Sequence, residues 1–212
     1  MSMNIKSRVH IISKIILLLI FLQLLLLSMT HCIFLFIKRT NFVDSMATMF
    51  AMIIITVFLI IFMRKKKISL SIFPKKLSAV YIIATIVAIL LFTATPSNFT
   101  GGFQAIILLF FSSMVTPIFE EIIFRSYVWN KLNNIFSREW ETYIVTTALF
   151  AFWHIGYISS IAFRVQNGLA MVMVWKVITG LCFGIILGAV RLKTKNSYST
   201  ILLHGVLNIF GR

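Results

Sequence analysis

The sequence predicts an all-α membrane protein, a polytopic bundle of about seven transmembrane helices. Of its 212 residues, 60% are hydrophobic, whereas soluble domains average about 45–50% apolar residues. The apolar residues come in long uninterrupted stretches, and most basic residues fall in the gaps between those stretches. Both patterns are typical of helices that cross a lipid bilayer, so the predicted surroundings of this chain are lipid.

Seven apolar stretches are candidate spans, because about 20 apolar residues cross the hydrocarbon core as a helix. The first stretch is longer than the roughly 7–15 residues of a cleavable signal core, so we expect it to be retained. Turn formers at Pro96–Asn98 and Gly101–Gly102 close the third. No repeat or linker is visible, which predicts a single membrane-embedded domain over residues 1–212. The predicted spans are residues 13–37, 45–63, 77–95, 103–124 with an extension toward 136, 142–161, 169–190 and 200–210.

The net charge of +15 comes from 20 Lys and Arg against five acidic residues. In a soluble chain such an excess suggests nucleic-acid binding. Here the basic residues follow the connections between spans, so nucleic acid is not an expected partner. Alternate connections hold 15 basic residues against four, with Lys176 left inside the sixth span. By the positive-inside rule, this asymmetry predicts a multi-pass protein of the cell membrane with a cytoplasmic N-terminus.

Two adjacent carboxylates, Glu120 and Glu121, lie inside the fourth span, where an ionisable side chain costs at least about 2.5–3.5 kcal/mol. Glu121 and Arg125 are four residues apart, so they share a helix face and can pair. Glu120 points away from that face and has no partner nearby in the sequence. Pro117 is expected to start or kink the helix just before the pair. A structural ion pair accounts for Glu121 and leaves Glu120 as the predicted reactive carboxylate.

Two further spans carry polar groups. His154 lies in the middle of the fifth span, where a single histidine is usually a packing residue. His204 and Asn208 are four residues apart in the last span and therefore share a face. Gly205 beside them permits close approach of another helix or of a substrate. Three separate spans thus present one-sided polar groups, which predicts that these groups converge inside the bundle. Glycines spaced by four within Gly180–Gly188 predict close helix packing and no chemistry.

A carboxylate, two imidazoles and an amide support two chemistries, and the sequence leaves both open. In the first, Glu120 is a general base for water, while a histidine and Asn208 donate hydrogen bonds to the developing oxyanion. In the second, His154, His204 and Glu120 bind a divalent metal such as zinc, with an open position at which water is activated. Neither chemistry needs a nucleophilic serine or cysteine.

Three short motifs resemble those of the CAAX protease and bacteriocin-processing family, also called the Abi family, which is related to the type II CAAX prenyl proteases. They are Glu-Glu-x-x-x-Arg at 120–125, Phe-x-x-x-His at 150–154 and His-x-x-x-Asn at 204–208. The resemblance covers about residues 103–212 and implies an all-helical intramembrane endopeptidase, described in relatives both as a metalloprotease and as a metal-free glutamate protease. It implies two groups of site residues: catalytic Glu120, His154, His204 and Asn208, and supporting Glu121 and Arg125.

The resemblance also implies a membrane-associated peptide or protein substrate that reaches the site from the cytoplasmic side. Bacterial members of this kind suggest a role in bacteriocin self-immunity or peptide maturation. One departure from the family is Ser126, where many relatives have glycine after the arginine. Two other functions stay open, a non-catalytic membrane immunity or scaffold protein of the same fold, and an ion or metal transporter that uses the buried groups. The sequence shows no inverted repeat of the kind common in transporters.

Overall fold

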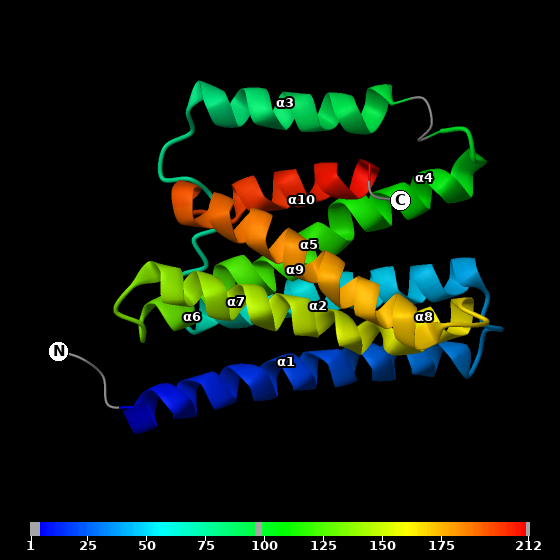
Figure 1. The fold of residues 1–212 in the computed structure, drawn as a ribbon. Coiled ribbons are helices and arrows are strands. Elements are labelled where there is room, and N and C mark those ends of the chain that lie inside the picture. Colours follow the sequence, from blue (N-terminus) through cyan, green and yellow to red (C-terminus); the bar gives the residue numbers. More distant parts are fainter. Residues whose placement is uncertain (1–4, 96–98, 211–212) are drawn as a thin grey trace.

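The computed structural model describes residues 5–95 and 99–210, in which all regular structure is helical. The long helices run back and forth along one common direction (Figure 1). The predicted turn at Pro96–Asn98, like Arg212, lies outside the described residues. The helices are α1 (Ile5–Phe34), α2 (Asn41–Lys65), α3 (Ala79–Ala94), α4 (Gly102–Phe110), α5 (Thr116–Glu121), α6 (Trp129–Asn133), α7 (Glu139–Trp153), α8 (Ile158–Arg164), α9 (Leu169–Thr194) and α10 (Tyr198–Phe210).

The predicted spans correspond to helical stretches of two lengths. Within the described residues, five stretches are long and apolar enough to cross a membrane by length and composition. The α3 and α10 helices are apolar but have only 16 and 13 residues, fewer than the roughly 20 that cross the core as a straight helix. The predicted polytopic helical bundle is confirmed, while the count of seven spans stays a prediction. The five long stretches are Lys6–Phe34, Asn41–Lys65, Gly102–Asn133, Glu139–Arg164 and Leu169–Thr194.

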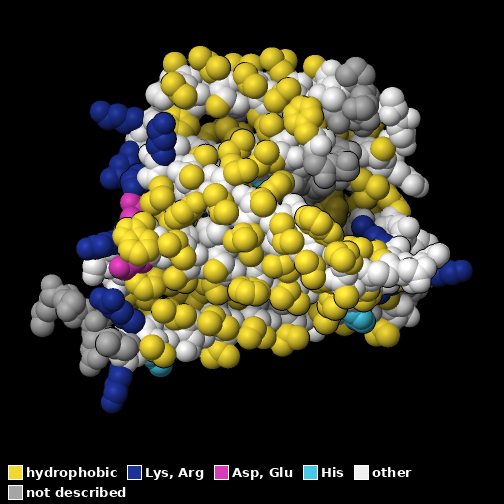
Figure 2. Space-filling view, in the orientation of Figure 1, with side chains coloured by type: hydrophobic (Ala, Val, Ile, Leu, Met, Phe, Trp, Pro, Cys, Tyr) yellow, Lys and Arg dark blue, Asp and Glu magenta, His cyan; other side chains and the backbone are white. Residues whose placement is uncertain are grey.

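Charged side chains gather at one end of the bundle. In Figure 2, Lys and Arg cluster mainly at the left end, and apolar side chains cover most of the face between the two ends. Two of the 15 basic residues expected in the more basic connections, Arg125 and Arg191, are instead buried inside the bundle. Arg191 donates from Nε to the Arg125 carbonyl at 2.8 Å and from Nη2 to Asn130 at 3.0 Å, which fastens α9 to α6. Without these two, the asymmetry is 13 basic residues against four.

The glycines of α9 allow it to lie close along α7, as their spacing predicts. A Cβ at Gly188 would lie 2.5 Å from ring carbons of Tyr143, and one at Gly184 would lie 3.0 Å from Cγ2 of Thr147. The close approach brings side-chain donors within reach of the α9 backbone. Thr147 donates to the Gly184 carbonyl at 3.2 Å, and the Tyr143 hydroxyl donates to the Ile185 carbonyl at 3.1 Å. Close helix packing through these glycines is therefore confirmed.

The helical stretch around Pro117 does not begin there, but it departs from a regular α-helix on both sides of this residue. One continuous helical stretch runs over Gly102–Asn133. It widens into π-helical turns at Phe111–Val115 and Ile122–Val128, on either side of α5. Proline lacks a backbone N–H, and its ring crowds the carbonyl four residues earlier. A π-helical turn before Pro117 offers a wider turn at this point, so the two glutamates lie inside a continuous helix rather than in its first turn.

Helix α10 packs against the backbone of the first π-helical turn. The Asn208 side chain donates from Nδ2 to the Ser112 carbonyl at 2.8 Å. A Cβ at Gly205 would lie 2.5 Å from the Ser113 carbonyl oxygen, so only glycine allows the two backbones to come this close. The close approach expected at Gly205 is therefore made by another helix of the same chain. It seats His204, one residue earlier, against α5.

The main apolar core joins the first two helices to the helices that carry the motifs. Buried side chains of α1 and α2 pack against those of α5, the second π-helical turn and α7. Helix α3 lies at the edge of the bundle against α10 and has no buried residue (Figure 1). The polar groups of the site lie between α5, α7, α9 and α10.

Candidate active site

Glu121 forms the ion pair that its spacing from Arg125 predicts. The carboxylate is completely buried, and Arg125 donates from Nη1 to its Oε1 at 3.0 Å. The guanidinium also lies 4.1 Å above the centre of the Phe150 ring. A second group, Nδ1 of His204, is 3.0 Å from the same carboxylate oxygen. Glu121 therefore has two nitrogen partners, and its negative charge is balanced inside the bundle by Arg125.

Glu120 has different surroundings, although its side chain is 2% exposed and equally deep. The hydroxyl of Tyr157 donates to Oε1 at 2.7 Å, and the indole Nε1 of Trp153 donates to that hydroxyl at 2.9 Å. On the other side, Oε2 lies 3.8 Å from Nε2 of His204, beyond hydrogen-bond distance. Within the described residues, Glu120 therefore has no basic partner in direct contact.

His204 lies between the two glutamates, with one ring nitrogen facing each. A carboxylate only accepts hydrogen bonds, so Nδ1 carries the proton that it donates to Glu121. In the neutral ring, Nε2 then has a free lone pair that faces Oε2 of Glu120. Glu121 thus fixes both the orientation and the tautomer of the imidazole that stands beside Glu120.

His154 is held in a similar way by a backbone carbonyl. Its Nδ1 is 2.8 Å from the Phe150 carbonyl, which only accepts, so Nδ1 is the protonated nitrogen. In the neutral ring, Nε2 is therefore an acceptor, so His154 in this state is not the histidine that donates to an oxyanion. A Cβ at Gly180 of α9 would lie 2.6 Å from Nδ1. The glycine row thus leaves space for this ring, a role that sequence spacing alone does not reveal.

The Phe150 ring joins the two histidines. Its centre is 4.9 Å from that of His154 and 6.1 Å from that of His204, with edge-to-face geometry in both pairs. Because its face also contacts Arg125, this ring packs against three of the polar groups at once. The phenylalanine of the Phe-x-x-x-His motif therefore forms an apolar wall of the site.

Asn208 is the predicted site residue that stands apart. Its amide contacts the Ser112 carbonyl rather than either glutamate or histidine, although it shares α10 with His204. An amide nitrogen carries two N–H groups, so one donor is left after this contact. Asn208 and Tyr157 both line one cavity of about 340 Å³. Asn208 thus shares the cavity with Tyr157, the hydrogen-bond partner of Glu120.

That cavity lies at the end of the bundle that holds the α1–α2 connection and α8. Its walls come from α1, α2, the first π-helical turn, the segment Gly156–Arg164 and the ends of α9 and α10. The Lys- and Arg-rich connections lie at the opposite end (Figures 1 and 2). The positive-inside rule assigns the basic end to the cytoplasm, so this cavity would face the other side of the membrane. That position does not agree with the expectation that the substrate reaches the site from the cytoplasmic side.

Tyr157 is a site residue that sequence reasoning missed. It lies between the cavity and Glu120, because it lines the cavity and its hydroxyl contacts Oε1. The spacing of four between Trp153 and Tyr157 is the one available signal, and aromatic residues at such spacing usually belong to a core.

Ser126, the departure from the family pattern, contacts Ser197 with the two hydroxyl oxygens 2.5 Å apart.

The donor groups do not fit a metal ion held by His154, His204 and Glu120. Within the described residues, no three His, Cys, Asp or Glu side chains come together in a group that could hold one. The His204 Nδ1 contacts Glu121 and the His154 Nδ1 contacts a carbonyl, which leaves one nitrogen on each ring. The Nε2 of His204 and Oε2 of Glu120 face each other.

Comparison with known proteins places these residues in a family. Residues 101–210, just over half of the chain, match the family described as type II CAAX prenyl endopeptidase Rce1-like. The match includes all three motifs, from Glu120 to Asn208, together with the helices that carry them. No curated protein and no solved structure matches the chain. The chain therefore belongs to the type II CAAX prenyl endopeptidase Rce1-like family, and it is a multi-pass membrane protein with the helical fold of an intramembrane protease.

Proposed function

We propose that the protein is an intramembrane endopeptidase in which Glu120 activates a water molecule to hydrolyse a peptide bond. One observation carries this proposal: of two adjacent buried carboxylates, Glu121 is neutralised by Arg125, whereas Glu120 has a tyrosine hydroxyl as its close partner. A buried carboxylate without a cationic partner is costly, so its presence indicates a chemical use. Membership of an endopeptidase family supports the same reading.

The hydrogen-bonding roles of the side chains suggest how the water is held. Water has two O–H groups, and the carboxylate of Glu120 and Nε2 of the neutral His154 ring are both hydrogen-bond acceptors. One O–H donates to each, which leaves a lone pair of the water oxygen free to attack the carbonyl carbon. His204, with its ring fixed by Glu121, stands beside Oε2 of Glu120 on the other side.

The proton balance of the reaction needs one acid–base group. Glu120 takes a proton from the water as the new C–O bond forms, and the carbonyl oxygen becomes a tetrahedral oxyanion. The remaining N–H of Asn208 donates a hydrogen bond to that oxyanion from the cavity side. The C–N bond then breaks, and Glu120 returns its proton to the leaving amine. The two products are a carboxylic acid, which keeps the second proton of the water until it ionises, and an amine, and the enzyme returns to its starting state.

The proposed substrate is a membrane-associated peptide or protein, because the site lies among helices that cross the bilayer. Self-immunity to a bacteriocin or maturation of a secreted peptide is the proposed biological setting. A non-catalytic immunity or scaffold protein of the same fold would protect cells without cleaving anything. Protection by the Glu120→Gln variant in a toxin-challenge assay separates the two, because only the non-catalytic protein keeps protecting.

The direct test compares peptide cleavage by the wild type and by Glu120→Gln, purified in detergent and assayed against membrane-peptide substrates. We expect Glu120→Gln to reduce kcat by at least about a hundredfold, the range associated with a general base. Its thermal unfolding should stay close to that of the wild type, since Glu120 has no ion pair to lose. Glu139→Gln is the matched control, because Glu139 is a glutamate paired with Lys195 far from the site.

Glu121→Gln should behave differently, because it leaves Arg125 buried without its partner. Breaking a buried ion pair from one side costs about 3–5 kcal/mol, so this variant should lose stability as well as activity.

Equal cleavage by the wild type and Glu120→Gln would contradict the proposal. Metal bound stoichiometrically by the purified protein, and lost in His154→Ala, would replace the metal-free mechanism with a metal-assisted one.

A further inference from the structure

The cavity beside the site has an unusual balance of charges. Of the charged side chains that line it, three are basic, Arg39, Arg164 and Lys176, and one is acidic, Asp44. The formal sum is therefore +2, in a cavity whose volume falls at the small end of the roughly 300–1,000 Å³ range of ligand pockets. Excess charge of one sign in a confined space favours a ligand of the opposite sign.

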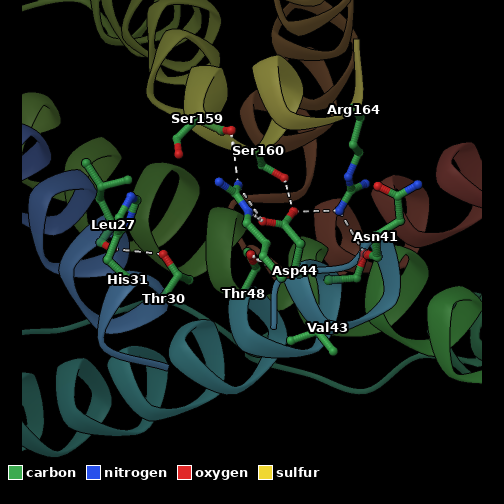
Figure 3. A network of polar contacts seen from close by, with 12 residues as sticks. Leu27, Thr30, His31, Asn41, Val43, Asp44, Thr48, Ser159, Ser160 and Arg164 are labelled. Atoms are coloured by element: carbon green, nitrogen blue, oxygen red, sulfur yellow. Dashed lines mark hydrogen bonds and ion pairs between the residues drawn. The ribbon is translucent and has the colours of Figure 1, made fainter. Parts of the chain in front are cut away.

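Asp44 is fully occupied within the protein and does not cancel this excess. The carboxylate is 2% exposed, and Arg39 donates to its Oδ1 from Nε at 2.9 Å and from Nη2 at 2.6 Å. Arg164 donates to Oδ2 from Nη2 at 2.7 Å, and Ser160 donates to the same oxygen. Figure 3 shows Asp44 at the centre of these contacts, with Ser160 and Arg164 above it. One carboxylate thus positions two guanidinium groups.

The two arginines differ in what they have left to offer. Arg39 lies between two aromatic rings, 4.8 Å from the centre of Phe34 and 4.3 Å from that of Phe163, and also donates to the Ser159 carbonyl. Arg164 has a side chain that is 40% exposed and uses only Nη2, on Asp44 and Ser45. Within the described residues, its Nε and Nη1 donors therefore remain free to bind a ligand.

Lys176 is the second available cation. It lies inside α9, in the sixth predicted span. A charged ammonium group within a span is energetically costly, so its presence indicates a function. No ion pair within residues 5–95 and 99–210 includes it. It lines the same cavity as Tyr157, whose hydroxyl contacts Glu120, so the cationic part of the cavity adjoins the site.

We propose that the cavity binds a carboxylate of the substrate, held by Arg164 and Lys176. The carboxylate is a free C-terminus or an acidic side chain close to the bond that is cut. Charge-assisted contacts from a guanidinium and an ammonium suit such a group. Tyr157 and Asn208 line the same cavity, so a peptide anchored by its carboxylate passes these residues on its way to Glu120. The proposal rests on the proposed peptidase function and specifies its substrate class.

Binding, rather than cleavage, is the appropriate test. The probes are four short leucine- and alanine-rich peptides, each with the same fluorescent label. The first pair differs at the C-terminus, which is a free acid in one peptide and an amide in the other. The second pair is amidated and carries an internal Glu in one peptide and Gln in the other. Affinity is measured by fluorescence anisotropy with the full chain in lipid nanodiscs. We expect a carboxylate-bearing probe to bind about tenfold or more tightly than its neutral counterpart. Preference for the free acid identifies a C-terminal carboxylate, and preference for the Glu probe identifies a side chain.

Lys176→Met removes the ammonium group while keeping a similar side-chain length. It should remove most of the preference for the carboxylate and leave affinity for the neutral probe unchanged. Lys67→Met, at the opposite end of the bundle, is the matched control and should have no effect. Equal affinity of the wild type for all four probes would overturn the proposal, as would equal weakening of every probe by Lys176→Met. Carboxylate preference without any cleavage would keep this proposal and contradict the peptidase function, so the two failures are distinguishable.

Discussion

Glu120 and Glu121 are neighbours in the sequence, yet their side chains have opposite surroundings. About 100° of helical rotation separates them, which directs one toward Arg125 and the other toward Tyr157. His204 lies between them and contacts Glu121 directly. The spacing of four predicted the first pairing because it is local. The groups beside Glu120 are Tyr157, in the short turn His154–Tyr157 between α7 and α8, and His204 of α10. Both are distant in the sequence, so only the packing of the helices determines them.

Tyr157→Phe tests whether the hydroxyl contact matters for catalysis. Removing a hydrogen bond to a carboxylate typically costs about 1.5–3 kcal/mol, so we expect kcat to fall roughly tenfold or more, with KM little changed. Tyr143→Phe is the matched control, because its hydroxyl donates to the Ile185 carbonyl away from the site. Steady-state kinetics of both variants, with thermal unfolding alongside, provides the measurement. An equal loss of kcat in both would assign Tyr157 a purely structural role.

Individual site residues were predictable to the extent that their partners are local. The Glu121–Arg125 pair follows from helical spacing, and so does the common helix of His204 and Asn208. The contact between Tyr157 and Glu120 joins residues 37 positions apart, and that between His204 and Glu121 joins residues 83 apart. Helical spacing carries no information about such distant pairs. The tautomer of His154, which makes its Nε2 an acceptor, likewise depends on a carbonyl that no motif records.

At the scale of helices, α9 contributes shape rather than chemistry to the site. Its glycines bring it close to α7, and Gly180 in particular leaves room for the imidazole of His154. Apolar stretches in the sequence predicted each helix, because burial in lipid requires long runs of hydrophobic residues. The two π-helical turns around α5 were not predicted, since they depend on how the helix packs as well as on Pro117.

Gly180→Ala separates packing from catalysis. Its Cβ would lie 2.6 Å from Nδ1 of His154, so the ring must move away from its position. Gly184→Ala also crowds the α7–α9 contact, through Thr147, without contacting the histidine. We expect both variants to lower the melting temperature, and only Gly180→Ala to lower kcat of the folded fraction, by about tenfold or more if His154 holds the water. Equal specific activity in the two folded variants would exclude His154 from that role.

At the scale of the whole molecule, the distribution of basic residues predicts on which side of the membrane the cavity opens. The excess of Lys and Arg at the other end predicts that the cavity opens on the face away from the cytoplasm. Ser69 and Asn167 are exposed residues in connections at opposite ends of the bundle. A single cysteine at either position, in a chain whose Cys32 and Cys182 have been replaced, reports on which side of the membrane that end lies. We expect a membrane-impermeant maleimide to label Asn167→Cys in intact cells, and Ser69→Cys only after permeabilisation. Labelling of Ser69→Cys in intact cells would reverse the orientation.

The walls of the cavity come from two parts of the chain with different relationships to the family. The matched segment, residues 101–210, supplies Tyr157 and Asn208 to the cavity, and it also carries Glu120 and both histidines of the adjoining site. Helices α1 and α2 lie outside that match, and they supply Gln23, Asp44 and Thr48 to the same cavity. A protease built in this way can inherit its reaction through one segment and vary its choice of peptide through the other. Grafting residues 1–95 from one such enzyme onto another would then exchange preferences while the chemistry stays in place.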